Sequence, residues 1–401
     1  MMNLEIPKKL KPLIDQAEQV AIHVFRPISR KYDLAEHAYP KELDLLAAAM
    51  DGMNASGGVG AGAGELSRKQ GSEAGVRNGT NMATALAMME LCWGDVGLAL
   101  SIPRQGLGNS AIAAVATPEQ KREFNGTWAA MAITEPAAGS DSGAIRATAV
   151  RDGDEWVING EKIFVTAGER CDSVVVWASL NLELGRAAIK SFIVPKGAPG
   201  MQVLRLEKKL GIRASDTATI MFSDCRIPLA NILGSPEVDT QKSFAGVMQT
   251  FDNTRPVVAA MAIGLARASL ELTREILAKE GIKPSYRGSI WTCSAAEAEL
   301  CRMEAEWEAA RLLTLRAAWM ADNGIPNSME ASMSKAKAGR MATDVTLRCV
   351  ELCGGAGYSE RDLLEKWARD SKILDIFEGT QQIQMLIVAR RLLGKKSSEL
   401  R

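Results

Sequence analysis

The spacing of apolar and polar residues divides the chain into three regions. In the first, residues 1–125, apolar positions recur three and four residues apart, for example over 13–25 and 82–100. This is the period of helices that bury one face. Pro27 and Pro40 punctuate the first predicted helices, because proline fits only near the start of a helix. We therefore predict a helical N-terminal domain.

The pattern changes between residues 126 and 235, where short runs are rich in β-branched and aromatic residues. Runs such as 156–158 and 173–177 are separated by turn sequences, for example Asn159-Gly160. Strands this short and this closely spaced are typical of a small antiparallel barrel or sandwich. The middle region is therefore predicted to be an antiparallel β domain.

Long helical patterns return after residue 240. Four segments carry the helical period, at residues 257–278, 295–323, 328–353 and 363–393. Four such segments suggest a helical bundle, and a turn at Glu378 interrupts the last of them. Together the three regions predict a multidomain protein of the α+β class.

Charge and composition narrow the range of functions. The chain has 48 Lys and Arg and 48 Asp and Glu, so no net field favours nucleic acid or an anionic membrane. Seven scattered cysteines form no disulfide framework, and two histidines near the N-terminus are too few for a metal site or a Ser-His-Asp triad. No apolar run approaches the ~20 residues of a membrane span, and no signal or transit segment is seen. We expect a cytoplasmic protein that binds no metal, nucleic acid or membrane.

The turn at residues 378–380 is the strongest candidate for chemistry. Glu378 lies between an apolar pair and a predicted helix over 381–393. Burial raises the pKa of a carboxylate toward neutrality, as a general base for a carbon acid requires. Gly379 lets the backbone approach a ligand closely, and the first N–H groups of the helix can face an anion or a polarised carbonyl. From spacing alone, a solvated glutamate at a corner between two helices is the more common arrangement.

A second candidate is the loop Ile133-Thr-Glu-Pro-Ala-Ala-Gly-Ser-Asp141. The backbone N–H groups and the hydroxyls of Thr134 and Ser140 suit a polar ring edge or a phosphate. An ordinary Pro-Gly surface loop has the same composition. Composition alone therefore leaves both interpretations open.

Several motifs, taken together, resemble the acyl-CoA dehydrogenases, flavoenzymes that desaturate acyl thioesters. Phe377-Glu-Gly-Thr-Gln-Gln-Ile-Gln384 looks like the active-site loop of that family, and the 133–141 loop resembles its Glu-Pro-x-Ala-Gly-Ser-Asp signature. Residues 159–168 are similar to its Gly-x-Lys-x-Trp-Ile-Thr-Asn strand, and residues 251–256 to its Asp-x-x-Arg segment. The resemblance covers residues 126–393 and implies three domains with a flavin between the last two. These are an N-terminal α-helical domain (1–125), a central antiparallel β-barrel (126–235) and a C-terminal four-helix bundle (240–401).

The resemblance also implies a role for each matching residue. Glu378 is the catalytic base that it implies, and Thr254 stands where one branch of the family carries its base instead. Phe164 replaces the usual Trp of the flavin-binding strand, which keeps an aromatic face but removes an N–H donor. The implied contacts to FAD are Ile133, Thr134, Ser140, Phe164, Val165, Thr166, Thr380 and Gln382. The implied contacts to the substrate are Ser140, Asp252, Arg255 and Gly379.

The implied reaction is α,β-desaturation of an acyl-CoA. Glu378 would remove the α-proton while a hydride leaves Cβ for flavin N5, and an electron-transferring flavoprotein would accept the electrons. The resemblance implies a homotetramer or hetero-oligomer in fatty acid or acyl-CoA catabolism. An acyl-CoA oxidase, which passes electrons to oxygen, is one alternative. The sequence leaves the length, branching and ring content of the acyl chain open.

Two departures from the family pattern favour another alternative, a half-site subunit of a hetero-oligomer. Residues 279–291 do not match the family's Arg-x-x-Phe-Gly segment, which binds the FAD pyrophosphate across a subunit interface, although Lys283 or Arg287 could substitute. Glu351 stands where the family tends to have Gln, and a carboxylate would repel a phosphate. In the half-site alternative, a partner chain supplies the missing contacts.

Overall fold

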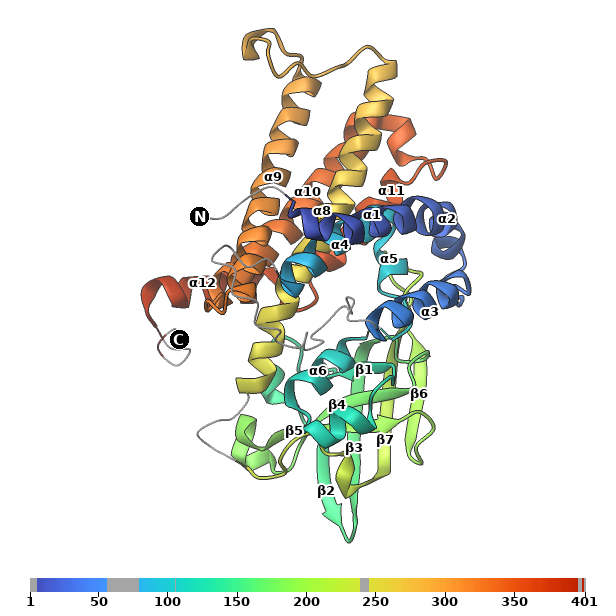
Figure 1. Cartoon of the computed structure of the whole chain (residues 1–401), viewed down its shortest axis with the longest axis vertical. Helices are drawn as coiled ribbons and strands as arrows, with labels where there is room; N and C mark the ends of the chain where they lie inside the picture. Colours follow the sequence, from blue (N-terminus) through green and yellow to red (C-terminus); the bar gives the residue numbers. More distant parts are fainter. Residues whose placement is uncertain (1–5, 56–78, 105, 239–244, 396–398, 400–401) are drawn as a thin grey trace.

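A computed structural model describes residues 6–55, 79–104, 106–238, 245–395 and 399 of the chain. Most of the helices gather at one end of the molecule, and the strands form a curved sheet at the other end, where α6 lies against β1 (Figure 1). This arrangement confirms the predicted α+β class.

The N-terminal region is helical, as predicted. Its α-helices are α1 (Lys11–Val20), α2 (Arg26–Leu34), α3 (Glu42–Ala55), α4 (Thr80–Gly94), α5 (Val96–Ala99), α6 (Leu107–Val115) and α7 (Pro118–Glu123). One π-helical turn, Ala21–Phe25, joins α1 to α2, and Pro27 lies in the first turn of α2. Because the wider π-helical turn directly precedes Pro27, the helical stretch continues past a residue that has no N–H. Thr117 begins α7 with a capping box, in which its hydroxyl accepts a hydrogen bond from the N–H of Gln120.

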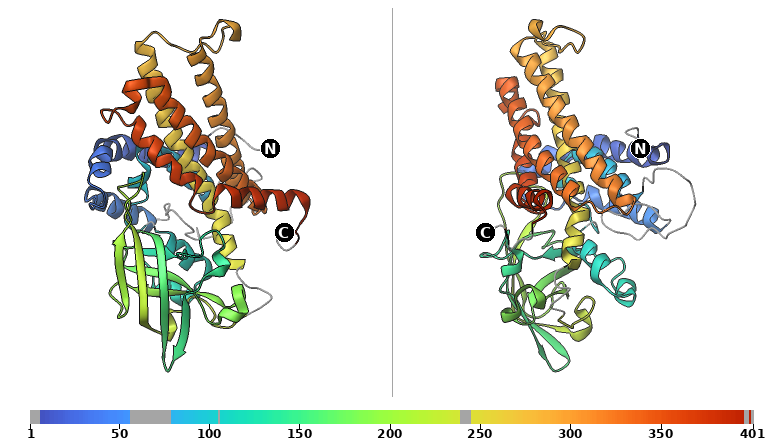
Figure 2. Two further views of the ribbon diagram at one scale, coloured as in Figure 1. Left: turned by 180° about the vertical axis from the view of Figure 1, so that it is seen from behind. Right: turned by 90° about the vertical axis from the view of Figure 1, so that its left-hand side faces the viewer.

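The middle region is one seven-stranded sheet in the order β1-β4-β2-β3-β7-β6, with β5 paired to β4. Its strands are β1 (Ala129–Ala132), β2 (Thr148–Asp152), β3 (Glu155–Thr166), β4 (Ser173–Ser179), β5 (Ile189–Pro195), β6 (Met201–Leu206) and β7 (Thr217–Pro228). The sheet curls without closing in this order of strands (Figure 2). It packs its inner side chains around a separate hydrophobic cluster of its own.

The prediction of an antiparallel barrel is wrong in one respect, because the sheet is mixed. β1 pairs with β4 in parallel, with Ala129 opposite Ser173, and β4 also meets the start of β2 in parallel. The remaining pairs are antiparallel. Alternation of apolar and polar residues identifies a strand but not its direction. The β2–β3 hairpin separates β1 from β4 in sequence. This long connection allows β4 to lie beside β1 and to run in the same direction.

Three long helices form the frame of the C-terminal region, α8 (Ala245–Lys279), α9 (Ala295–Asp322) and α10 (Ser328–Tyr358). The fourth predicted segment is two helices, α11 (Leu364–Ser371) and α12 (Gln381–Leu393), separated by a 3-10 turn and the Glu378 loop. α11 packs on α8 and α10, and α12 packs on α10. α12 projects sideways from the long helices in Figure 1 and in the left-hand view of Figure 2.

The N-terminal and C-terminal helices share one hydrophobic cluster, in which α4 packs against α8. The division into domains 1–125 and 240–401 therefore stays a prediction. Contrary to our expectation from the sequence, one segment, Thr254–Lys279 of α8, has the length and hydropathy of a membrane span. However, 78% of its most apolar window is buried inside the protein, as in the core helix of a soluble fold.

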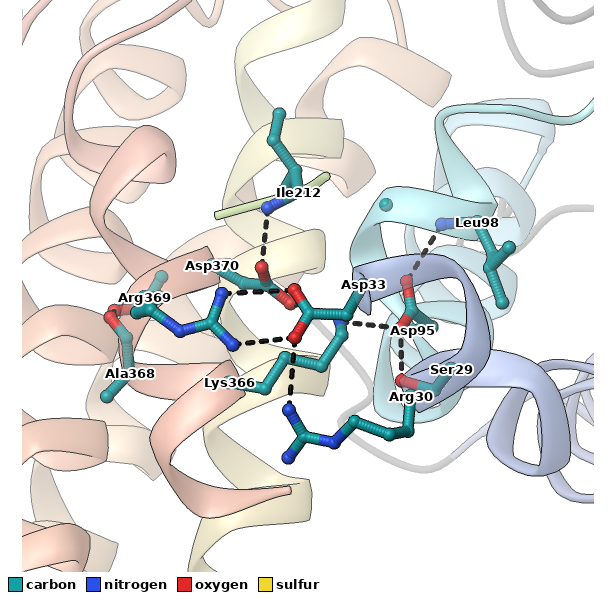
Figure 3. A network of polar contacts seen from close by, with 12 residues as sticks. Ser29, Arg30, Asp33, Asp95, Leu98, Ile212, Lys366, Ala368, Arg369 and Asp370 are labelled. Carbon is teal, nitrogen blue, oxygen red and sulfur yellow. Dashed lines mark hydrogen bonds and ion pairs between the residues drawn. The ribbon is translucent and has the colours of Figure 1, made fainter. Parts of the chain in front are cut away.

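A buried polar network joins all three regions (Figure 3). We call it the interdomain network; its members are Ser29, Asp33, Asp95, Lys366, Arg369 and Asp370. The ammonium of Lys366 donates to Asp95 at 2.7 Å and to Asp370 at 2.6 Å, and Ser29 donates to Asp95. Asp370 also accepts a hydrogen bond of 2.5 Å from the backbone N–H of Ile212, in the segment between β6 and β7.

The outer part of the interdomain network is an ion pair between Arg369 and Asp33, with nitrogen–oxygen distances of 2.7 and 3.0 Å (Figure 3). Burial raises the pKa of Asp370, and the charge of Lys366 opposes this rise. Burial disfavours the charge on Lys366, but the attraction of Asp370 and Asp95 is stronger than this effect and raises the pKa of Lys366. Since the members come from helices α2 and α11 and from the start of α5, the network fixes how these elements meet.

Candidate active site

The predicted turn at Glu378 is present and sharply bent. Both Glu378, with φ of 55°, and Gly379, with φ of 87°, have left-handed backbone conformations. This conformation is costly for a residue other than glycine, and such residues gather at functional sites. Thr380 then caps α12, which confirms the predicted helix over 381–393, by accepting a hydrogen bond from the N–H of Ile383 at 3.4 Å.

The carboxylate of Glu378 is held against α8. The hydroxyl of Thr254 donates to its Oε2 at 2.9 Å. Burial raises the pKa of Glu378, while the bond from Thr254 and the charges of Arg255 and Lys335 oppose this rise. A carboxylate with a raised pKa is a stronger base than a solvated one. The residue is only partly exposed, so it is not the solvated corner glutamate of the alternative interpretation.

Two further side chains hold the backbone of the turn. The amide nitrogen of Gln384 donates to the carbonyls of Glu378 and Gly379, both at 3.1 Å. The ammonium of Lys335, from α10, donates to the carbonyl of Gly379 at 2.6 Å. Because a trans peptide points its N–H away from its C=O, these bonds direct the N–H groups of Gly379 and Thr380 away from Lys335 and Gln384.

The 133–141 loop is built on a buried ion pair that sequence reasoning missed. Lys162, inside β3, donates to Glu135 at 2.7 Å and to the carbonyl of Ile133 at 3.0 Å. Glu135 also accepts hydrogen bonds from the N–H groups of Arg146 and Ala147, at 2.6 and 3.0 Å. Burial lowers the pKa of Lys162 to about 8, against the influence of Glu135. The sequence indicated this ion pair only by one lysine inside a β-rich run and one glutamate inside the loop.

The same contacts bring the loop beside the predicted flavin-contact strand. The N–H of Ile163 donates to the carbonyl of Thr134 at 2.9 Å. The pairing of β3 with β7 shifts register between Lys162 and Val165, and Phe164 has a φ of 56° at this bulge. The bulge leaves Phe164 60% exposed while Val165 is buried in the core of the sheet.

The remaining predicted residues have different surroundings. Ser140 and Gln382 are exposed, and Thr166 is partly exposed. Arg255 is buried on α8 and donates to the hydroxyl of Ser332 at 3.5 Å. The side chain of Asp252 lies outside the described part of the chain. Thus the structure gathers the predicted residues into two groups, one around Glu378 and one along the 133–141 loop and β3.

The site can perform acid–base chemistry but offers no cluster of metal ligands. Among the residues described, no three His, Cys, Asp or Glu side chains are grouped so as to hold a metal ion. A partly buried carboxylate at the start of a helix suits proton abstraction, and an exposed phenylalanine at a strand bulge offers a flat apolar surface. The described chain is thus an α+β protein with a helical part, a curled mixed sheet and a partly buried carboxylate turn.

Comparison with known proteins identifies the family. Residues 130–225 match the acyl-CoA dehydrogenase middle domain, and residues 244–393 match the acyl-CoA dehydrogenase C-terminal domain. The human mitochondrial short-chain specific acyl-CoA dehydrogenase is 33% identical over 98% of this chain and 92% of its own length. A probable acyl-CoA dehydrogenase of Bacillus subtilis is 35% identical over 80% of this chain and 85% of its own length.

Solved structures agree with this assignment. Butyryl-CoA dehydrogenase from Megasphaera elsdenii superposes with a TM-score of 0.82 and 27% identity, over 98% of this chain and 100% of that chain. The chain belongs to the acyl-CoA dehydrogenase family. It is therefore an oxidoreductase and an FAD-dependent flavoprotein.

Proposed function

We propose that this chain desaturates an acyl-CoA thioester between Cα and Cβ, with Glu378 as the base that removes the α-proton. The observation that carries this proposal is the Glu378 turn itself. Its carboxylate accepts a hydrogen bond from Thr254, and burial raises its pKa. Such a group can take a proton from carbon at neutral pH, provided that the developing enolate is stabilised.

The chain's own groups supply that stabilisation in the proposed reaction. An N–H group of the Glu378 turn would donate to the thioester carbonyl, where negative charge develops. Loss of one donor of this kind raises the barrier by ~3 kcal/mol. Arg255 supports the same carboxylate by its charge, and for Asp252 we propose a contact to the pantetheine arm. Ser140 and Gly379 complete the proposed substrate contacts.

The residues around the 133–141 loop fit the edge of a flavin ring. The loop is held rigid by Lys162 and Glu135, and the exposed ring of Phe164 at the β3 bulge offers a flat surface beside it. We propose that Ile133, Thr134, Ser140, Phe164, Val165, Thr166, Thr380 and Gln382 hold FAD. FAD supplies the hydride acceptor when it is bound.

Short acyl chains are the proposed substrates. Several relatives, including those of Bos taurus and Clostridium acetobutylicum, are named short-chain specific acyl-CoA dehydrogenases. The bovine relative is 36% identical over 78% of this chain. Butyryl-CoA is therefore the first substrate to test.

We propose an electron-transferring flavoprotein as the electron acceptor. A chain from the structure reported as "Electron transferring flavoprotein of Acidaminococcus fermentans" superposes with a TM-score of 0.84 and 30% identity. An acyl-CoA oxidase would use the same base but release hydrogen peroxide under air. A peroxide assay during turnover therefore separates the two activities.

We propose that the chain assembles into a homotetramer or hetero-oligomer, in the cytoplasm. α12 projects from the long helices and exposes Met385, Leu386, Leu392 and Leu393, which favours a partner on this helix.

Glu351 forms an ion pair with Arg348, which also pairs with Glu299 at 3.1 Å. This pairing reduces the repulsion that Glu351 alone would exert on a phosphate, and so weakens one of the two observations behind the half-site alternative.

The first test is the visible spectrum of the purified chain. We expect oxidised-flavin bands that butyryl-CoA bleaches without oxygen, because hydride transfer reduces the flavin. The Glu378→Gln variant should bind FAD but lose bleaching by at least about a thousandfold, since the amide cannot accept the proton. A flavin-containing protein that no acyl-CoA bleaches would contradict the proposed function. A colourless protein that takes up no added FAD would favour the half-site alternative.

A further inference from the structure

Lys335 differs from the other fully buried lysines of the described chain. Lys162, Lys335 and Lys366 are each at most 1% exposed. Lys162 is paired with Glu135, and Lys366 with two aspartates. Among the described residues, Lys335 has no carboxylate within ion-pair distance, and its ammonium donates instead to the carbonyl of Gly379. A buried charge without a close counter-ion costs several kcal/mol, so its retention indicates a function.

The carbonyl that Lys335 holds belongs to the residue next to Glu378. The bond is 2.6 Å long, and it reaches from α10 to a turn that two positive φ angles make costly. The turn is also tightly packed, since a Cβ on Gly379 would lie 2.4 Å from the amide nitrogen of Gln384. Among the described side chains, loss of the ammonium would leave Gln384 as the remaining donor to this carbonyl.

The charge of Lys335 also acts on the carboxylate itself. The charged groups around it come from three elements: Asp375 from the 3-10 turn, Glu378 from the loop and Arg255 from α8. Asp375 and Glu378 attract the ammonium and Arg255 repels it, while burial lowers the pKa of Lys335 to about 8. In turn, Lys335 favours the ionised form of Glu378, together with Arg255 and the hydroxyl of Thr254.

We propose that Lys335 is a positioning residue for the base, which fixes the Gly379–Thr380 peptide through its hydrogen bond and keeps the Glu378 carboxylate ionised through its charge. This inference rests on the proposed function for its effect on turnover. Its effect on the ionisation of Glu378 is independent of any substrate. The two effects can therefore be measured separately.

The test compares Lys335→Met with Lys337→Met in the FAD-loaded chain. Lys337 lies on the same helix but pairs with Glu306 and is partly exposed, so it is a matched control. Flavin reduction by butyryl-CoA is followed anaerobically from pH 5 to 9. We expect Lys335→Met to slow reduction at least about tenfold at pH 7 and to move the acid limb of the profile up by about one pH unit. Lys337→Met should match the parent in both respects.

A second readout follows the carboxyl of Glu378 without substrate. Its infrared band is assigned by its absence in Glu378→Gln and is titrated in the parent and in Lys335→Met. The midpoint should rise by about one pH unit in the variant, because a nearby positive charge is lost. If Lys335→Met does not fold, Lys335→Gln provides the same loss of charge with a polar side chain.

These readouts distinguish the failure of this inference from the failure of the proposed function. A parent protein that no acyl-CoA reduces contradicts the proposed function, while a raised infrared midpoint in the variant still supports the role of Lys335. A folded Lys335→Met protein with an unchanged infrared midpoint and an unchanged rate of reduction overturns the inference.

Discussion

At the scale of single residues, opposing influences set the basicity of Glu378. Burial raises its pKa, and Thr254, Arg255 and Lys335 restrain the rise. The hydroxyl of Thr254 donates a hydrogen bond directly to the carboxylate, at 2.9 Å. Hydrogen bonds to a charged group contribute about 1.5–3 kcal/mol, which corresponds to about one to two pKa units.

The Thr254→Val variant should therefore raise the pKa of Glu378 further. We expect the acid limb of flavin reduction to move up by about one pH unit, with reduction about tenfold slower below that limb and little changed above it. The pH profile with butyryl-CoA is the measurement. Thr273→Val, a buried threonine farther along α8, is the control and should keep the parent profile. An acid limb that stays in place would show that the hydroxyl does not stabilise the carboxylate.

At the scale of elements, the buried pair of Lys162 and Glu135 joins β3 to the loop that follows β1. Glu135→Gln leaves the lysine without a counter-ion, and we expect the free energy of unfolding to fall by about 3–5 kcal/mol. Urea denaturation at pH 7 measures this loss, and the FAD content should fall with it. Glu155→Gln removes a half-exposed partner of Arg226 and should cost at most about 1 kcal/mol. If Glu135→Gln and Glu155→Gln lowered the free energy of unfolding equally, the buried pair would stabilise the fold no more than the exposed pair does.

Local signals explain which elements the sequence predicts well. The Glu378 turn and the bounds of α12 were predictable because Gly379 and Thr380 are a turn residue and a helix cap next to each other in sequence. The parallel pairing of β1 with β4 was not, because strand direction depends on contacts between distant segments. Lys162 and Lys335 were missed for the same reason, since their partners lie 27 and 44 residues away.

At the scale of the whole molecule, the interdomain network gives stability that depends on pH. Burial already raises the pKa of Asp370, and Lys366 is the cation that opposes it. Lys366→Met should lower the free energy of unfolding by about 3–5 kcal/mol at pH 8, because a buried carboxylate pair loses its cation. This loss of unfolding free energy should be smaller at pH 5 than at pH 8. In the variant, the pKa of Asp370 is higher in the folded state than in the unfolded state. As the pH falls through the folded-state pKa, the folded form therefore takes up a proton before the unfolded form does, and this stabilises the folded form.

Urea denaturation at both pH values measures this difference. Lys11→Met, which removes an exposed partner of Asp15 at the surface, is the control and should change stability by less than about 1 kcal/mol at either pH. A loss that is the same at pH 5 and pH 8 would show that the carboxylates of the interdomain network do not take up protons.

The interdomain network also constrains the order in which the protein can mature during its synthesis. Asp33 is made 336 residues before its partner Arg369, and Asp95 is made 271 residues before its partner Lys366. Until then the nascent helices carry carboxylates that cannot be buried with their partners. We therefore expect the helical part to complete its core only after the segment with Lys366 and Arg369 has been made, and to depend on chaperones in the interval.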